Sequence, residues 1–263
     1  MVKQGVNVPN FGPFGSARAV ADISAAAERA GWDGVFLWDH VVRREGDLPV
    51  VDPWVALSAA AVATRRVELG PLVTPLARRR PWNVAKAAVS IDLLSQGRFI
   101  LGIGLGTPRG PEFPSFGEET DLRRRGDMVD EGIEVIRAAW SGRPVNFAGR
   151  HYRVDNIRFL PTPARMGGIP VWGATERLSG RPVRRAAGLD GIFPVGIRPG
   201  DLPALLDNLR QARGNLAGFD VVAVSQDDDA ASWQAAGATW WQRELPWGES
   251  YEKCLAIVSD GPR

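Results

Sequence analysis

The chain has 263 residues, 44% of them hydrophobic and 24% charged, which is the composition of an ordinary globular protein. Its net charge of +2 gives no electrostatic reason to expect a nucleic-acid partner, and no stretch approaches the roughly 20 apolar residues of a membrane span. The N-terminus MVKQGVNVPNFG has no apolar signal-peptide core, and the single cysteine, Cys254, cannot form an internal disulfide, so we expect a cytoplasmic protein without membrane or nucleic-acid partners.

Strands and helices alternate along the first hundred residues. Ser16 can cap a first helix whose apolar stripe keeps helical spacing, and Gly31 suits the position after its end. Asp52 followed by Pro53 predicts the start of a second helix, and Pro81 opens a third. Short apolar strands are expected around these helices over residues 5–8, 34–37, 67–73 and 99–103.

The second half continues the pattern after an insertion. Asp121 can cap a fourth helix that ends at Trp140. The stretch VNFAGRHYRV, residues 145–154, reads as two short strands around Ala148 and Gly149, which predicts an inserted hairpin. Further strands are expected over residues 169–172, 191–195, 219–224 and 238–242, and further helices over 179–187, 202–213, 229–236 and 249–258.

About eight strand–helix units in succession imply parallel pairing, and eight such units can close into a barrel. We therefore predict an α/β fold, a (β/α)8 TIM barrel with a small inserted hairpin after the fourth helix, in a single domain over residues 1–263. An open doubly wound sheet is the main rival. The glycine-rich stretch GIGLG, residues 102–106, fails the dinucleotide fingerprint, because Arg109 stands where the third glycine is required.

The stretch VFLWDHVV, residues 35–42, places Trp38, Asp39 and His40 directly after the second predicted strand. In a TIM barrel the carboxyl ends of the strands form the mouth where chemistry takes place, so these side chains are candidate site residues. His40 is one of only two histidines, and beside an acid it could hold or move a proton. The alternative is that Asp39 and His40 only cap the end of the strand.

Other site chemistries find less support. The second histidine, His151, falls in the predicted hairpin and Cys254 in the last helix, so we expect no histidine-rich zinc site and assign no metal ligands. A carboxylate-bound magnesium stays open, whereas the nucleophile motif G-x-S-x-G is absent. Glycine-rich strand ends, aromatic residues and one histidine suit a flat, anionic organic cofactor better than a metal.

Several fragments, in order along almost the whole chain, resemble the luciferase-like monooxygenase family of flavin- or deazaflavin-dependent oxidoreductases. They are AERAGWDGVFLWDH (27–40), LGPLVTPLARRRPW (69–82), IDLLSQGRFILGIGLG (91–106), PEFPSFGEE (111–119), GRHYRV (149–154) and IPVWGATERLSGRPVRRAAGLDGIFP (169–194). The resemblance implies the same barrel fold, a homodimer and an activity on a small organic substrate.

The resemblance also implies roles for individual residues. Asp39 and His40 match an acid–histidine pair at the cofactor ring, where His40 would donate or accept a proton and Asp39 would orient it or bond the ring. A non-proline cis peptide is expected at residues 71–72 or 72–73. Cofactor contacts are expected from Leu72, Val73, Thr74, Gly104, Gly106, Gly173, Ala174, Thr175 and Arg177, and substrate contacts from Trp38 and Trp54.

Each of these residues also has a structural interpretation. Thr74 could simply shape a loop, and the two glycines at 104 and 106 could serve tight barrel packing. The run ARRRP, residues 77–81, reads by default as a solvated loop, and Glu112 as a loop acid without a catalytic role.

Two reactions fit such a site. Reduced FMN with oxygen would make a monooxygenase, whereas coenzyme F-420, a 5-deazaflavin, would give hydride transfer without oxygen activation. Either enzyme could depend on a separate flavin or F-420 reductase as a partner. A non-catalytic flavin-binding or scaffold member of the same fold is the second hypothesis, and a carboxylate-metal barrel hydrolase is the third.

Overall fold

The computed structural model describes residues 1–43, 47–107, 110–226 and 230–262. Within them, parallel strands form a sheet in the order β3-β2-β1-β11-β10-β9-β8-β5-β4. The sheet closes on itself because a parallel bridge joins Leu69 of β3 to Phe99, and the Ile100 amide donates to the Leu69 carbonyl at 2.9 Å. The predicted (β/α)8 barrel is confirmed, with β3 and β4 as two parts of one barrel strand. The strands are β1 (Lys3–Val8), β2 (Gly34–Leu37), β3 (Glu68–Pro71), β4 (Thr74–Pro75), β5 (Leu101–Gly104), β8 (Val171–Thr175), β9 (Gly191–Pro194), β10 (Asp220–Ser225) and β11 (Trp240–Glu244).

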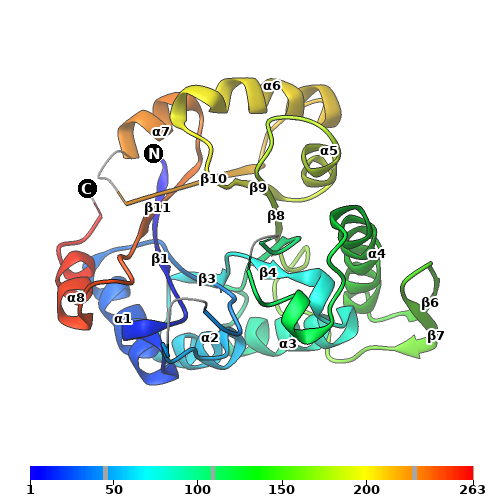
Figure 1. Cartoon of the computed structure of the whole chain (residues 1–263), viewed down its shortest axis with the longest axis horizontal. Helices are drawn as coiled ribbons and strands as arrows, with labels where there is room; N and C mark the ends of the chain where they lie inside the picture. Colours follow the sequence, from blue (N-terminus) through cyan, green and yellow to red (C-terminus); the bar gives the residue numbers. More distant parts are fainter. Residues whose placement is uncertain (44–46, 108–109, 227–229, 263) are drawn as a thin grey trace.

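Helices cover the outside of this barrel (Figure 1). The side chains of Ser16, Asp52 and Asp121 each accept a hydrogen bond from a first-turn amide, as predicted, and Gly31 ends the first helix with a φ of 96°. None of the helices in the described part of the chain is long and apolar enough to cross a membrane. The helices are α1 (Ala17–Ala30), α2 (Pro53–Ala63), α3 (Pro81–Leu94), α4 (Leu122–Trp140), α5 (Arg181–Ala187), α6 (Leu202–Arg213), α7 (Ala230–Ala236) and α8 (Tyr251–Ser259).

Some element boundaries differ from the predicted ones. The strand expected over residues 67–73 is interrupted at Leu72 and Val73, which lie between β3 and β4. The helix expected from residue 179 begins at Arg181, because Gly180 has a φ of 88° and cannot belong to a right-handed helix. Arg109, which stands three residues after the glycine-rich stretch, and Asp229, the first residue of a predicted helix, lie outside the described residues.

The inserted hairpin consists of β6 (Pro144–Ala148) and β7 (Arg153–Arg158), which pair antiparallel. It follows the fourth helix, as predicted, and projects beyond α4 at the edge of the molecule (Figure 1). Val145, Tyr152 and Val154 bury their side chains in a small cluster with Val135 of α4. The hairpin is therefore packed on the outer helix layer, and His151 lies with it, away from the barrel mouth.

Large apolar side chains fill the inside of the barrel. Phe36, Trp172 and Trp240 pack together, with ring centroids 5.0–5.6 Å apart, and Ile100 and Val222 join the same cluster. Because side chains alternate along a strand, Trp240 faces this interior. Its neighbour on β11 belongs instead to the core between the barrel and its helices. The described interior of the barrel is therefore filled by side chains.

Candidate active site

A cavity of about 450 Å³ opens at the carboxyl ends of the barrel strands. This volume lies in the range of small-molecule and cofactor sites. Its apolar wall is formed by Leu72, Val73, Ala174, Phe193, Val195 and Val224. Polar side chains reach it from several strands and loops: Asn7, His40, Glu112, Thr175, Arg177 and Glu244. The cavity thus combines an apolar wall with a few polar groups that converge from different elements.

His40 presents its imidazole to this cavity with 19% of its side chain exposed. Its Nδ1 lies 3.1 Å from Oε2 of Glu112, and its Nε2 lies 3.5 Å from a guanidinium nitrogen of Arg43. A carboxylate can only accept and a guanidinium can only donate. The contacts therefore match the tautomer with the proton on Nδ1, whose Nε2 lone pair faces the guanidinium of Arg43.

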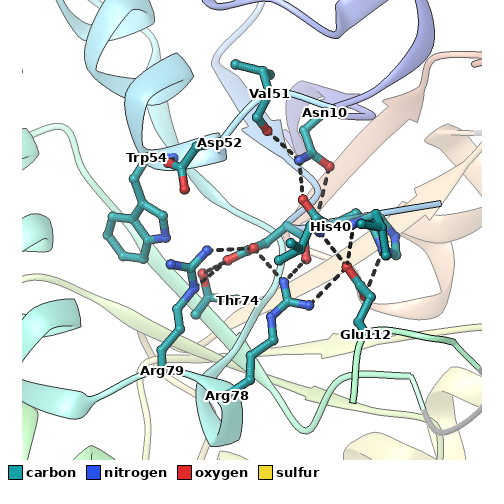
Figure 2. A network of polar contacts seen from close by, with 12 residues as sticks. Asn10, His40, Val51, Asp52, Trp54, Thr74, Arg78, Arg79 and Glu112 are labelled. Carbon is teal, nitrogen blue, oxygen red and sulfur yellow. Dashed lines mark hydrogen bonds and ion pairs between the residues drawn. The ribbon is translucent and has the colours of Figure 1, made fainter. Parts of the chain in front are cut away.

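Glu112 is almost fully enclosed, with 2% of its side chain exposed. Its Oε1 accepts a hydrogen bond from the Val41 amide and lies 3.0 Å from Nη1 of Arg78 (Figure 2). Burial opposes ionisation of this carboxyl. The hydrogen bonds from His40 and Val41 and the charge of Arg78 outweigh burial and lower the pKa of Glu112 from its ordinary 4.5 to about 2. The carboxylate is therefore charged at neutral pH.

Asp39 does not contact the imidazole in the way the sequence suggested. Its carboxylate is fully buried and bonds the Thr74 hydroxyl at 2.6 Å, and it forms ion pairs at 2.8 Å with both Arg78 and Arg79 (Figure 2). The expectation that Asp39 orients His40 is corrected: Glu112 contacts the ring, while Asp39 fixes the two arginines. The expectation of a solvated loop is also wrong for Arg78, whose side chain is 5% exposed.

Asn10 ties the backbone of His40 in place. Its Nδ2 donates to the carbonyl oxygens of His40 at 2.8 Å and of Val51 at 2.7 Å, and its Oδ1 accepts from the His40 amide at 3.1 Å. Trp38, next to them, donates its indole N–H to Oδ1 of Asn7. The segment after β2 is therefore held on both sides before any ligand binds.

The third barrel strand contains the predicted non-proline cis peptide, at Leu72–Val73. This feature sits between β3 and β4, where both side chains line the cavity. Opposite it, a Cβ on Gly104 would lie 2.8 Å from Cγ2 of Val73 and 3.3 Å from Cβ of Ala174. The strand can come this close to its neighbours only with glycine at position 104.

The remaining predicted site residues divide between the cavity and its surroundings. Ala174 and Gly106 line the cavity, as do Thr175 and Arg177. The Thr175 hydroxyl accepts from the Arg177 amide at 3.0 Å and so shapes the turn that presents Arg177.

Three predicted contacts face elsewhere. A Cβ on Gly173 would meet Leu189 at 2.9 Å, on the helix side of β8. Thr74 is fully buried against Asp39, and Trp54 is 8% exposed and packs on Phe99. Within the described residues, no group of three or more His, Cys, Asp or Glu side chains is arranged to hold a metal ion.

Sequence reasoning missed Glu112 and the two arginines. Glu112 lies 72 residues after His40, in a loop whose course no periodicity predicts. The neighbouring Phe113 could have indicated its position, because a large aromatic residue between two prolines is expected to be buried and to bring this part of the loop to the protein interior.

Comparison with known proteins gives the chain its family. The family model described as luciferase-like monooxygenase matches residues 3–254. The chain belongs to the luciferase-like monooxygenase family. An F420-dependent glucose-6-phosphate dehydrogenase of Nakamurella multipartita is 32% identical over 236 residues, covering 83% of this chain and 66% of that protein. The chain spans about two thirds or less of the length of the curated relatives it matches.

Solved structures of other proteins share the fold over nearly all of the chain. A coenzyme F420-dependent tetrahydromethanopterin reductase from Methanopyrus kandleri superimposes with a TM-score of 0.80 at 17% identity, covering 98% of this chain and 97% of that one. The monooxygenase RslO1 from Streptomyces bottropensis gives a TM-score of 0.77 at 20% identity, covering 98% of each chain. At these identities the likeness shows the luciferase-like barrel and no more.

Proposed function

We propose that this chain is an oxidoreductase that binds a flavin or deazaflavin ring in the cavity and uses His40 to move a proton at the bound substrate. The proposal rests above all on the contact of His40 with Glu112, which places a buried negative charge behind an imidazole that faces an apolar cavity. This arrangement resembles a positioned acid–base pair more than a strand cap.

The described residues fit a flat, anionic ring system. The apolar wall that includes Leu72 and Val73 offers one face, and Gly104 leaves the space on the neighbouring strand that a side chain would fill. Arg177 and Thr175 lie at the cavity wall, where a guanidinium and a hydroxyl can hold a phosphate. When bound, the ring would supply the two-electron chemistry, either as hydride transfer or, for reduced FMN, as reaction with oxygen.

The chain itself would supply the proton chemistry. When a substrate hydroxyl takes the place of the Arg43 contact, the lone pair on Nε2 of His40 can accept its proton, and Glu112 stabilises the imidazolium that results. In the reverse direction the same atom returns the proton to a substrate oxygen. Asp39 takes no part in this transfer; together with Arg78 it holds Glu112 and the segment after β2 in position.

Hydride transfer with a deazaflavin is the reaction we favour. The curated relatives at 30–34% identity are named as F420-dependent dehydrogenases, and a hydroxyl-bearing substrate suits a basic Nε2. Oxygen activation with reduced FMN is the second candidate, since the monooxygenase RslO1 shares the fold over 98% of the chain.

Titration of the purified protein with FMN and with the deazaflavin tests the proposal. We expect fluorescence quenching with a Kd tighter than about 1 mM for at least one of them, which corresponds to about −4 kcal/mol. Turnover is then measured with a panel of alcohols that includes glucose 6-phosphate, and as oxygen uptake with reduced FMN.

The substitution His40→Asn is the critical variant for this test. It should lower kcat by about 100-fold or more and leave the cofactor Kd within threefold, because it removes the proton acceptor and keeps the shape. Absence of binding by both cofactors would refute the cofactor site. Unchanged turnover of His40→Asn would remove His40 from the mechanism, and binding without turnover would favour a non-catalytic member of the family.

We also propose that the protein is a homodimer and works with a separate flavin or F-420 reductase, which would reduce FMN for the oxygen reaction or reoxidise the deazaflavin that alcohol oxidation reduces. Val55 and Val62 of α2 support the dimer, because they are 58% and 60% exposed and, seven residues apart, lie on one face of the helix.

A further inference from the structure

Arg125, in the second turn of α4, is unusually buried for an arginine, with 1% of its surface exposed. Its guanidinium carbon lies 3.4 Å from the centroid of the Phe113 ring. Its Nε donates to the Glu119 carbonyl at 2.6 Å, and its Nη1 contacts the Thr107 carbonyl at 3.5 Å. A buried charge is costly unless such partners compensate it, so these contacts form a built arrangement.

Phe113 is the residue through which this arrangement reaches the site. It is fully buried and directly follows Glu112 in the chain. Its ring edge lies against Gly106, where a Cβ would be 2.5 Å from Cε2 of Phe113 and 3.0 Å from Pro75. The ring thus fits a notch that only glycine leaves, with the guanidinium of Arg125 over its face. Little freedom remains for the backbone at Glu112.

We propose that Arg125 is a positioning residue that holds the Glu112 carboxylate against His40. Stacking on Phe113 fixes the residue next to Glu112, and the bonds to Glu119 and Thr107 fix the chain on either side of it. From there the contacts run to Nδ1 of His40 at 3.1 Å. A lysine could not replace this arginine, because a planar guanidinium both stacks and donates in two directions.

The proposal rests on the proposed function only for its effect on turnover, so its main test needs no cofactor. The imidazole ¹⁵N chemical shifts report which ring nitrogen bears the proton. The chain has two histidines, and His151 in the outer hairpin serves as an internal reference. In the wild type we expect the Nδ1–H form of His40. In Glu112→Gln we expect a smaller share of this form, because an amide can donate as well as accept and only the Arg43 contact then favours it.

The test compares Glu112→Gln with three further single variants, each at a temperature well below its unfolding transition. Arg125→Met keeps the length of the side chain and removes charge and donors, and Phe113→Leu removes the stacking surface while Arg125 stays. Arg213→Met is the matched control, since Arg213 lies 4.9 Å from the ring centroid of Phe219 and donates to two carbonyl oxygens at 2.7 and 2.9 Å, in a different part of the barrel.

Arg125→Met and Phe113→Leu should shift the His40 signals in the direction of Glu112→Gln, and Arg213→Met should leave them unchanged. Arg125→Met should add no further shift in the Glu112→Gln background, because both act through the same contact. With cofactor and substrate present, kcat of Arg125→Met should fall about 10- to 100-fold, as expected when a catalytic group is displaced. The cofactor Kd should stay within threefold.

Wild-type His40 signals in Arg125→Met, or equal shifts in Arg213→Met, would overturn the proposal, as would a Glu112→Gln variant with unchanged His40 signals. If Arg125→Met does not fold, Phe113→Leu decides by the same readout. If the wild type binds neither cofactor while the ¹⁵N shifts behave as expected, the proposed function fails and the positioning role of Arg125 stands.

Discussion

Glu112 carries a charge where water hardly reaches, and the groups that stabilise this charge come from two separate places in the chain. His40 and the Val41 amide follow β2, and Arg78 follows β4. Because these donors satisfy the carboxylate, they turn a costly burial into a fixed negative charge behind the imidazole. The loop after β5 and the segment after β2 are therefore joined through one side chain.

The lowered pKa of Glu112 predicts a specific acid sensitivity. Its folded value of about 2 lies below the ordinary 4.5, so the stabilisation is complete above about pH 4.5 and is lost as the pH falls toward 2. The shift corresponds to about 3 kcal/mol of unfolding free energy. Urea unfolding at pH 7, 5 and 3 should show a steeper loss for the wild type than for Glu112→Gln. Glu176→Gln, at an exposed glutamate, should follow the wild type, and parallel slopes in all three proteins would contradict the assignment.

Asp39 should matter for folding more than its position beside His40 suggests. Asp39→Asn removes the negative charge opposite Arg78, whose side chain is 5% exposed, and leaves that guanidinium buried with one carboxylate fewer. We expect a loss of about 3–5 kcal/mol in unfolding free energy, measured by urea denaturation.

The exposed pair Arg153–Asp155 provides the control for Asp39. Both of its side chains are about 80% exposed and lie 4.0 Å apart, so Asp155→Asn should change the unfolding free energy by less than about 0.5 kcal/mol. Equal losses in the two variants would show that the network around Asp39 contributes nothing special.

At the residue scale, the sequence predicted where the site residues lie better than it predicted which side chains they contact. The position of Trp38, Asp39 and His40 after β2 placed them at the barrel mouth, because the carboxyl ends of all strands meet there in a TIM barrel. It could not show that Asp39 turns toward the arginines and that Glu112 meets the ring, because such pairings depend on the course of a loop without periodicity. The same limit explains why Arg78 was taken for a solvated residue.

At the scale of elements, β5 shows how a strand shapes the cavity. Gly104 faces Val73 and Ala174 at distances that leave no room for a methyl group, while Gly106 has a φ of 79° and touches Phe113. Both glycines therefore serve the site through close approach of backbone and side chains. The first keeps the cavity floor flat, and the second seats the loop that bears Glu112.

Gly104→Ala should consequently weaken cofactor binding. The added methyl group must displace Val73 or protrude into the cavity, and overpacking of this kind costs about 1–3 kcal/mol. We expect the Kd for the bound flavin or deazaflavin to rise by about 5- to 150-fold in a fluorescence titration. Gly200→Ala, where a Cβ would meet nothing within 4 Å, should leave the Kd unchanged. A Kd for Gly104→Ala equal to that of the wild type would place the ring elsewhere.

The elements themselves followed from local signals. Ser16, Asp52 and Asp121 cap their helices as predicted, and the hairpin at residues 144–158 appeared as a break in the alternation. Gly173 was predicted to face the cofactor but faces the helices. A one-residue change of register along β8 turns a residue from the cavity side to the helix side, and the sequence pattern does not fix this register. A strand's existence was easier to predict than the direction of each of its side chains.

At the scale of the whole molecule, the outer face of α2 should decide the oligomeric state. We expect a dimer by light scattering of the eluted protein at tens of micromolar. Val55→Glu combined with Val62→Glu should yield a monomer, because four charges would be buried in the interface.

The control for this face uses apolar residues that are exposed elsewhere. Leu160→Glu combined with Met166→Glu, at positions 51% and 97% exposed, should leave the dimer intact. A monomeric wild type would refute the dimer. Dissociation by the control pair alone would show that the interface includes Leu160 or Met166 and not the outer face of α2.

The filled barrel interior has a consequence for the order of events. Phe36, Trp172 and Trp240 close the barrel below the cavity, so the mouth is its way in and out. If cofactor and substrate both enter through the barrel mouth and one lies beneath the other, they cannot exchange independently. The ligand that sits deeper must arrive first and depart last, and the enzyme would then show compulsory-order kinetics in which the outer ligand traps the inner one.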